Sequence, residues 1–120
     1  MVRAGLTRKH LDVPELLALL DPAVSVPVLS PRVLADGVTW FDTPAPEFRL
    51  YLVELGGPPV TLPGAGPRIV LCLEGACVLS GGSGEALELG RGASCFISAA
   101  DAPVEAAGSA RLVLAAPGAP

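Results

Sequence analysis

Two cationic side chains and one hydroxyl lie close together at the start of the chain, and their types suit them to hold a phosphate group. Arg3, Thr7 and Lys9 fall within seven residues, with Gly5 between them. Arginine presents a planar fork of N–H donors, lysine carries a compact charge on a flexible stem, and the glycine backbone can approach a ligand closely. These residues predict an anion site. The alternative reading of the same residues is a solvated basic terminus without a ligand.

Residues 3–7 (RAGLT) and Lys9 also resemble the close of a long enzyme signature. In the zinc-dependent mannose-6-phosphate isomerases of type I this signature ends in Arg-Ala-Gly-x-Thr-Pro-Lys, and residues 11–17 (LDVPELL) resemble the segment that comes next in that family. Further along, the strand at Phe48 and residues 69–75 are similar in pattern to the C-terminal cupin domain of the same family. The resemblance extends over nearly the whole chain and is strongest in its first part.

The resemblance implies a sugar-phosphate isomerase. Enzymes of this family interconvert mannose 6-phosphate and fructose 6-phosphate by moving a proton between C1 and C2, while a bound zinc ion polarises the substrate oxygens. By match, Arg3 is the catalytic arginine that stabilises charge, and Lys9 binds the substrate in the same pocket. Arg8 replaces the proline of the signature, so the backbone before Lys9 is less restrained.

Metal ligands are scarce in this sequence. The zinc ligands of the family (a Gln, a Glu and two His) precede the signature, so we expect no cofactor in this chain, although the full-length family uses zinc. His10 is the single histidine, whereas a catalytic zinc ion needs about three protein ligands. Cys72 and Cys77 form one Cys-x4-Cys pair, and a structural zinc site needs two such pairs or added histidines. We predict no metal ligands and expect Cys72, Cys77 and Cys95 to be small core residues.

Two pairs of carboxylates are close in sequence: Glu85 with Glu88, and Asp101 with Glu105. Each lies on an alternating strand or in a loop, so we expect outward-facing charges rather than acid–base pairs. The cupin metal motif, His-x-His followed by Glu, does not occur in the sequence. The β region is therefore expected to hold no catalytic centre of its own.

The elements that must position these residues begin with a short helix. Asp12 is the expected N-cap, Pro14 lies in the first turn, and Glu15 follows the cap by three residues. The leucines at 16, 17 and 20 share one helical face. The helix is expected to end before Pro22, after about two turns.

Beyond the helix, three prolines in residues 22–36 indicate an extended connector, and from Gly37 onward the pattern is β. The expected strands are 38–41, 48–53, 60–62, 68–73, 76–80, 86–89, 93–97, 103–106 and 110–115. Glu74-Gly75 is read as a tight hairpin turn and Gly108-Ser109 as another turn. In the 48–53 strand, the residues at 48, 50 and 52 alternate with those at 49, 51 and 53.

This pattern predicts a mainly β fold in a single domain, residues 1–120. It has three parts: 1–21 (motif and helix), 22–36 (connector) and 37–120 (β domain). The architecture expected from strands and turns is a β-sandwich or jelly roll, and the resemblance makes it a cupin-like jelly roll (β-sandwich or barrel) with one short N-terminal helix.

Composition excludes several classes of protein. The net charge is −4, with no basic stripe that could neutralise a nucleic-acid backbone. The sequence has no apolar run long enough to cross a membrane and no signal peptide, so a cytoplasmic location is expected. Three cysteines, an odd number, favour reduced thiols over a disulfide framework.

Two functions from different classes are consistent with these residues. The first is the C-terminal domain or fragment of a mannose-6-phosphate isomerase, inactive alone because the zinc ligands are missing, with its catalytic domain on a separate or missing segment. The second is a stand-alone, non-catalytic cupin-like module that binds a sugar phosphate or serves in assembly. Neither reading involves a nucleic acid or a membrane.

Overall fold

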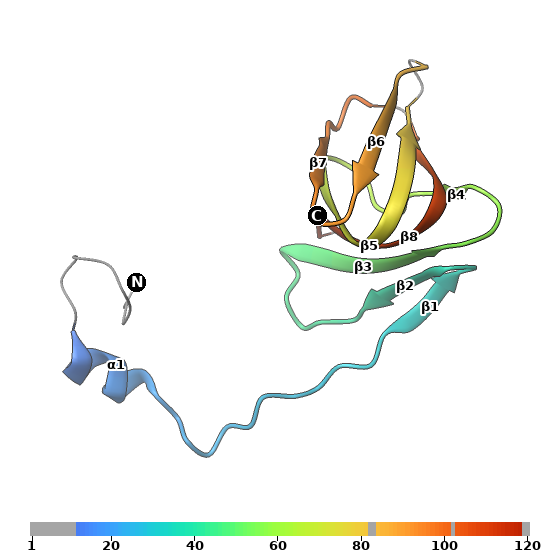
Figure 1. Cartoon of the computed structure of the whole chain (residues 1–120). Coiled ribbons are helices and arrows are strands. Elements are labelled where there is room, and N and C mark those ends of the chain that lie inside the picture. The colour runs from blue at the N-terminus through green and yellow to red at the C-terminus, as the bar shows by residue number, and fades with distance from the viewer. Residues whose placement is uncertain (1–11, 82–83, 102, 119–120) are drawn as a thin grey trace.

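The computed structural model describes residues 12–81, 84–101 and 103–118 (Figure 1). Within these ranges the chain forms one helix, α1 (Val13–Leu19), and eight strands. The strands are β1 (Arg32–Ala35), β2 (Val38–Phe41), β3 (Phe48–Leu55), β4 (Val60–Thr61), β5 (Arg68–Ser80), β6 (Ala86–Gly90), β7 (Ser94–Ile97) and β8 (Glu105–Pro117). The expected mainly β architecture with one short N-terminal helix is confirmed.

Helix α1 begins as its capping residues predict. The Asp12 Oδ1 atom accepts a hydrogen bond from the backbone N–H of Glu15 at 3.0 Å, and proline occupies the first turn. The helix ends at Leu19, and its C-cap residue Leu20 has an extended backbone. It buries no residue, and Leu17 and Leu20 are about 60% exposed. The described parts of the chain contain no helix that is long and apolar enough to span a membrane.

The helix and the segment after it form an N-terminal arm (residues 13–31) that projects from the β domain (Figure 1). Residues 24–31 belong to neither a helix nor a strand. The arm lengthens the molecule to 54 Å and gives a radius of gyration of 18.0 Å. A compact chain of this length has a radius of gyration of about 14 Å. The expected connector (22–36) is therefore extended as far as residue 31, and its last residues form β1.

One strongly curled sheet makes up the rest of the molecule, in the order β1-β2-β3-β8-β5-β6 (Figure 1). The two longest strands, β5 and β8, pair along their lengths. At one end of this pair, β5 also pairs with β7, and β8 also pairs with β3. At the other end, β5 pairs with β6, and β8 pairs with β4. Because each long strand has different neighbours at its two ends, the sheet folds over on itself and encloses a core.

The expected hairpin turns at Glu74-Gly75 and Gly108-Ser109 were wrong: β5 and β8 each run through these positions without reversing. Both glycines have positive φ, +75° and +133°, which a turn would also require. Here the glycines instead allow the backbones of β5 and β8 to approach each other closely. A Cβ on Gly75 would lie 2.1 Å from the Ser109 carbonyl oxygen, and one on Gly108 would lie 2.7 Å from the Ala76 carbonyl oxygen.

A β-bulge between Cys72 and Glu74 allows β5 to serve both ends of the sheet. Before the bulge the even-numbered residues of β5 are buried, and after it the odd-numbered residues Cys77 and Leu79 are buried. The extra residue of a bulge changes which face a side chain occupies. The strand thus keeps its apolar residues turned toward one core while it bends.

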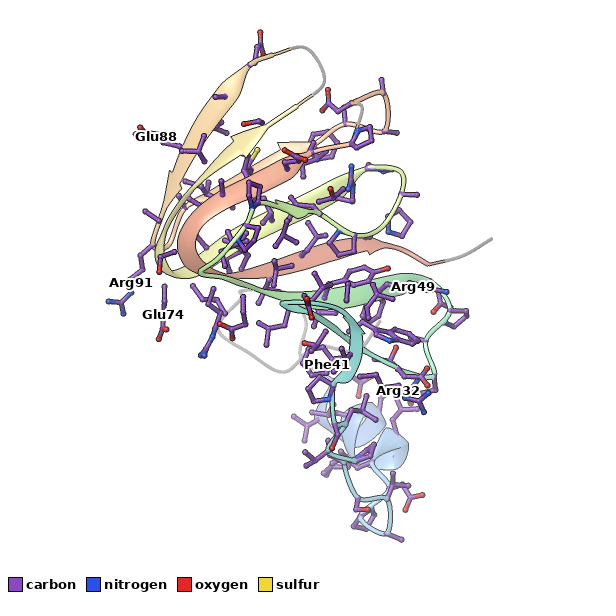
Figure 2. All side chains as sticks on the ribbon, turned by 90° about the vertical axis from the view of Figure 1, so that its right-hand side faces the viewer. Arg32, Phe41, Arg49, Glu74, Glu88 and Arg91 are labelled. Atoms are coloured by element: carbon purple, nitrogen blue, oxygen red, sulfur yellow. The ribbon has the colours of Figure 1, made fainter. Side chains whose placement is uncertain are left out.

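The core is aliphatic and closely filled, and Figure 2 shows side chains occupying the space that the strands enclose. Its largest fully buried side chains are Val53, Val70, Cys72, Leu112 and Leu114. In β3 the buried residues are the odd-numbered Tyr51, Val53 and Leu55.

Candidate functional site

The residues expected to carry chemistry, Arg3 and Lys9, lie outside the described residues, together with Thr7, Arg8 and His10. The described part of the chain starts at Asp12, which caps the helix directly after this motif. The roles assigned to Arg3 and Lys9 therefore stay predictions.

The three cysteines behave as packing residues. Cys72 and Cys77 are buried in the core and Cys95 is half-buried. The Cys72 Sγ atom donates to the Glu74 carbonyl oxygen at 3.3 Å. Burial raises the pKa of the Cys77 thiol, and the neighbouring Cys72 raises it further. Burial, followed by the charge of Asp101, raises the pKa of Cys95. Both Cys77 and Cys95 are thus neutral thiols at pH 7, and a thiol is a poor nucleophile compared with a thiolate.

The carboxylates that could have formed acid–base pairs are surface groups. Glu85, Glu88 and Glu105 are exposed, and Figure 2 shows Glu88 pointing away from the sheet. The Asp101 Oδ2 atom accepts a hydrogen bond from the Ser98 backbone N–H at 2.9 Å and so closes a loop. The structure therefore gives each of these acidic residues a solvated or structural place.

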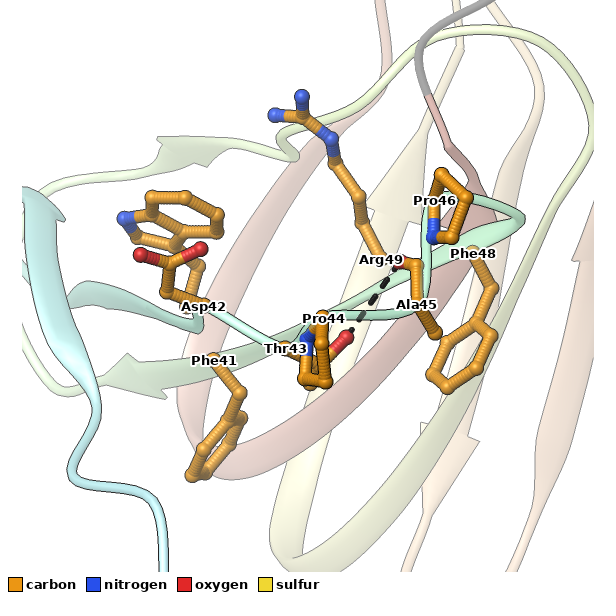
Figure 3. A pocket seen from close by; sticks show the side chains of 9 residues that line it. Phe41, Asp42, Thr43, Pro44, Ala45, Pro46, Phe48 and Arg49 are labelled. Atoms are coloured by element: carbon orange, nitrogen blue, oxygen red, sulfur yellow. Dashed lines mark hydrogen bonds between the residues drawn. The ribbon is translucent and has the colours of Figure 1, made fainter.

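A pocket of about 260 Å³ lies where β2 turns into β3, in a segment whose sequence pattern indicates only a turn. Its walls are residues 40–46 with Phe48 and Arg49 (Figure 3). The volume is slightly below the usual range for a small-molecule site, about 300–1,000 Å³. The signal that could have indicated it is a proline-rich turn with aromatic residues on both sides and an arginine close by.

Charge and aromatic surface meet at this pocket. The Arg49 guanidinium carbon lies 5.6 Å from the centre of the Trp40 ring, a cation–π distance. Across the pocket rim, Arg32 Nη2 and Asp42 Oδ2 form an exposed ion pair at 3.2 Å. The Thr43 hydroxyl donates to the Ala45 carbonyl oxygen at 3.5 Å, which the dashed line in Figure 3 marks. In such a site an aromatic side chain can stack on one face of a ligand ring, and the arginine can attract an anion.

Arg68 is the one charged side chain among the described residues that is buried, with 6% of its surface exposed. Its Nη1 group donates to the carbonyl oxygens of Leu62 and Pro63, at 3.4 and 3.2 Å. Its Nε atom is buried without a hydrogen-bond partner. Arg68 therefore ties the loop after β4 to the start of β5, a structural role that its position at a strand start did not reveal.

The side chains of the described residues do not provide the set of ligands that a zinc ion needs. Among the residues that the structure describes, no three His, Cys, Asp or Glu side chains come together as a possible metal site. The two cysteines inside the core are surrounded by aliphatic side chains. A zinc site needs about three or four such ligands, so no chemistry of a zinc ion is assigned to the β domain.

Comparison with known proteins gives one consistent result. The family model "Mannose-6-phosphate isomerase, cupin domain" matches residues 38–117. The mannose-6-phosphate isomerases of Salmonella typhimurium and Escherichia coli are each 33% identical to this chain over 114 residues, which is 93% of this chain and 29% of theirs.

Solved structures agree with the sequence comparison. The crystal structure of the Salmonella typhimurium enzyme bound to its substrate and zinc superposes with a TM-score of 0.79 at 30% identity. It matches 98% of this chain and 30% of that one. The apo form of the same enzyme gives a TM-score of 0.78 at 30% identity, over 98% of this chain and 31% of that one.

The chain thus spans less than a third of the relatives it matches. The family model matches most of the chain and includes β2 to β8. The cupin-like jelly roll expected from the sequence is confirmed, and the chain belongs to the mannose-6-phosphate isomerase family through its cupin domain.

Proposed function

We propose that this chain is the C-terminal cupin part of a mannose-6-phosphate isomerase and that it has no isomerase activity alone. The observation that carries the proposal is the filled, aliphatic interior of the β domain. Val53, Val70 and Leu114 occupy the inside of the sheet with no exposed surface. An interior of this kind stabilises a fold, and its polar groups serve packing: the Cys77 thiol is neutral, and Arg68 donates to the carbonyl oxygens of Leu62 and Pro63.

The catalytic roles belong to the motif and to a partner. Arg3 would stabilise charge in the active site and Lys9 would contact the sugar phosphate, while a catalytic domain on another segment or another chain would supply the zinc ligands. The reaction would be the interconversion of mannose 6-phosphate and fructose 6-phosphate, in the cytoplasm. The relatives support this assignment because they are mannose-6-phosphate isomerases, and the structure of one of them contains bound substrate and zinc.

The test compares the chain alone with a chimaera. In the chimaera this chain replaces the matching segment of the Salmonella typhimurium enzyme, which the likeness in sequence and fold permits. We expect no turnover of mannose 6-phosphate by the chain alone with added zinc, and turnover by the chimaera. In the chimaera, Arg3→Ala should lower kcat about 100-fold, as loss of a charge-stabilising donor does.

The matched control in the chimaera is Arg91→Ala, because Arg91 is an exposed arginine in a turn of the β domain and points into solvent (Figure 2). It should leave kcat unchanged. Zinc-dependent turnover by the isolated chain would refute the claim of inactivity. An unchanged kcat in the Arg3→Ala chimaera would remove Arg3 from the catalytic machinery.

A second candidate, a stand-alone sugar-phosphate-binding module, is favoured by one observation, the pocket in which Arg49 lies over Trp40. Calorimetric titration of the free chain with fructose 6-phosphate tests it. Under this function, binding should weaken about tenfold or more in Arg49→Ala, since a hydrogen bond to a charged group is worth about 1.5–3 kcal/mol. Arg91→Ala is again the control. No measurable heat of binding by the unmodified chain would eliminate this function.

A further inference from the structure

The outer face of the sheet, opposite the core, carries a continuous apolar surface across four strands. Leu50 of β3 pairs with Ala115 of β8, Ala115 pairs with Ile69 of β5, and Ile69 pairs with Phe96 of β7. Directly paired side chains on one face lie about 5 Å apart, so this row is contiguous. Ile69 is 54% exposed and Phe96 is 64% exposed.

A second row lies beside the first. Leu52 of β3 pairs with Val113 of β8, and Val113 pairs with Leu71 of β5. All three are two residues along their strands from members of the first row and share its face. We call the two rows together the outer apolar face. Its principal side chains are Leu50, Leu52, Ile69, Leu71, Phe96 and Val113.

One end of this face is bounded by a neutral ion pair. Glu54 and Arg111, the next outward residues of β3 and β8, form an ion pair at 2.8 Å between Arg111 Nε and Glu54 Oε1. The charge at this end is therefore compensated within the chain. Monomeric proteins seldom expose a large contiguous apolar patch without a partner, so this face has the character of an interface.

The N-terminal arm has a second uncovered apolar surface. Val24, Val26 and Val28 are 69%, 91% and 95% exposed. The segment that carries them is joined to no strand of the sheet. Leu17 and Leu20, on the helical part of the arm, are also exposed. Exposed apolar side chains of this kind gain free energy when another polypeptide covers them.

We propose that the outer apolar face and the N-terminal arm together bind the catalytic part of a mannose-6-phosphate isomerase, so that this chain docks through its sheet and not through its turns. The inference rests on the proposed function. The relatives carry more than two-thirds of their length outside the region matched here. A partner of that size can cover the face and the arm at once, whereas a second copy joined through the face would leave the arm exposed.

The experiment measures protection of the face in the same chimaera with the Salmonella typhimurium enzyme. Phe96→Cys is introduced on a Cys95→Ala background, and its labelling by a maleimide at pH 7 is compared between the chimaera and the free chain. We expect labelling to be slower in the chimaera by about tenfold or more, because a buried thiol reacts only when its surroundings open. Val26→Cys reports on the arm in the same way.

The matched control is Glu88→Cys. Glu88 is exposed, points away from the sheet (Figure 2) and lies on β6, which pairs only with the other end of β5. It should be labelled at the same rate in both proteins. Equal labelling of Phe96→Cys in the chimaera and the free chain would overturn the proposal, even if the chimaera is active. Protection of Phe96→Cys in an inactive chimaera would support the interface and count against the proposed function alone.

Sedimentation of the free chain provides an independent check. We expect a monomer at low micromolar concentration. A stable dimer that Ile69→Glu dissociates, and that Glu88→Lys leaves intact, would assign the face to a second copy of this chain and would refute the proposed occupant.

Discussion

At the scale of single residues, the sequence predicts chemistry in a motif at one end of the chain and predicts no catalytic centre in the β domain. Inside that domain, cysteines take the place of small aliphatic residues. Burial raises the pKa of the Cys77 thiol, with Cys72 as the second cause. The Cys77 thiol is therefore a packing group whose ionisation opposes folding, not a nucleophile.

This raised pKa predicts how stability depends on pH. Below the ordinary thiol pKa, about 8.5, Cys77 is protonated in the folded and unfolded states and stability is fully present. As the pH rises above that value, the unfolded thiol ionises first, so the unfolded state binds fewer protons and the free energy of unfolding falls. Urea denaturation between about pH 7 and 9.5 should show this decline, and Cys77→Ala should reduce its slope. An equal slope in both proteins would contradict the assignment.

At the scale of elements, α1 shows what local signals can predict. Its cap, its first-turn proline and its end all involve neighbours in sequence, and the structure has them as expected. Strand β2 likewise has the predicted bounds, and β3 begins at Phe48 as predicted. The bends of β5 and β8 could not be predicted in the same way. Gly75 requires a positive φ whether it makes a hairpin or a close contact with a partner strand, and only the pairing of β5 with β8 decides between them.

The close approach at Gly75 predicts the effect of adding a methyl group there. Gly75→Ala meets both a positive φ and the Ser109 carbonyl oxygen, 2.1 Å from the new Cβ, so it should lower the free energy of unfolding by about 2–4 kcal/mol. Gly84→Ala is the matched control, since Gly84 has a φ of +83° with nothing within 4 Å. It should cost about 1 kcal/mol. Similar losses in the two variants, measured by urea denaturation, would mean that the strands do not approach so closely.

At the scale of the whole molecule, the β domain and the arm differ in what holds them. The domain has its own core of buried residues on β2 to β8. The arm contributes no buried residue, and its helix leaves Leu17 and Leu19 exposed to solvent. The described arm therefore adds little to the stability of the free chain, and its exposed apolar residues are available to the partner proposed above.

Removal of all residues before Arg32 tests this division. The free energy of unfolding of the β domain should change by less than about 1 kcal/mol, because the described arm buries no side chain against it. Urea denaturation followed by tryptophan fluorescence measures this through Trp40, the single tryptophan. A loss of several kcal/mol would show that the arm packs on the domain in solution.

The sequence by itself determined the family, the helix with its cap, the β character of the rest and the shortage of metal ligands, because these depend on residue types and on neighbours along the chain. Only the tertiary structure decided that β5 and β8 run unbroken through their glycines, that Arg68 is buried, and that Ile69 and Phe96 share one exposed face. Each of these depends on which distant strand lies alongside. Pairing between distant segments leaves no periodic signal in either segment alone.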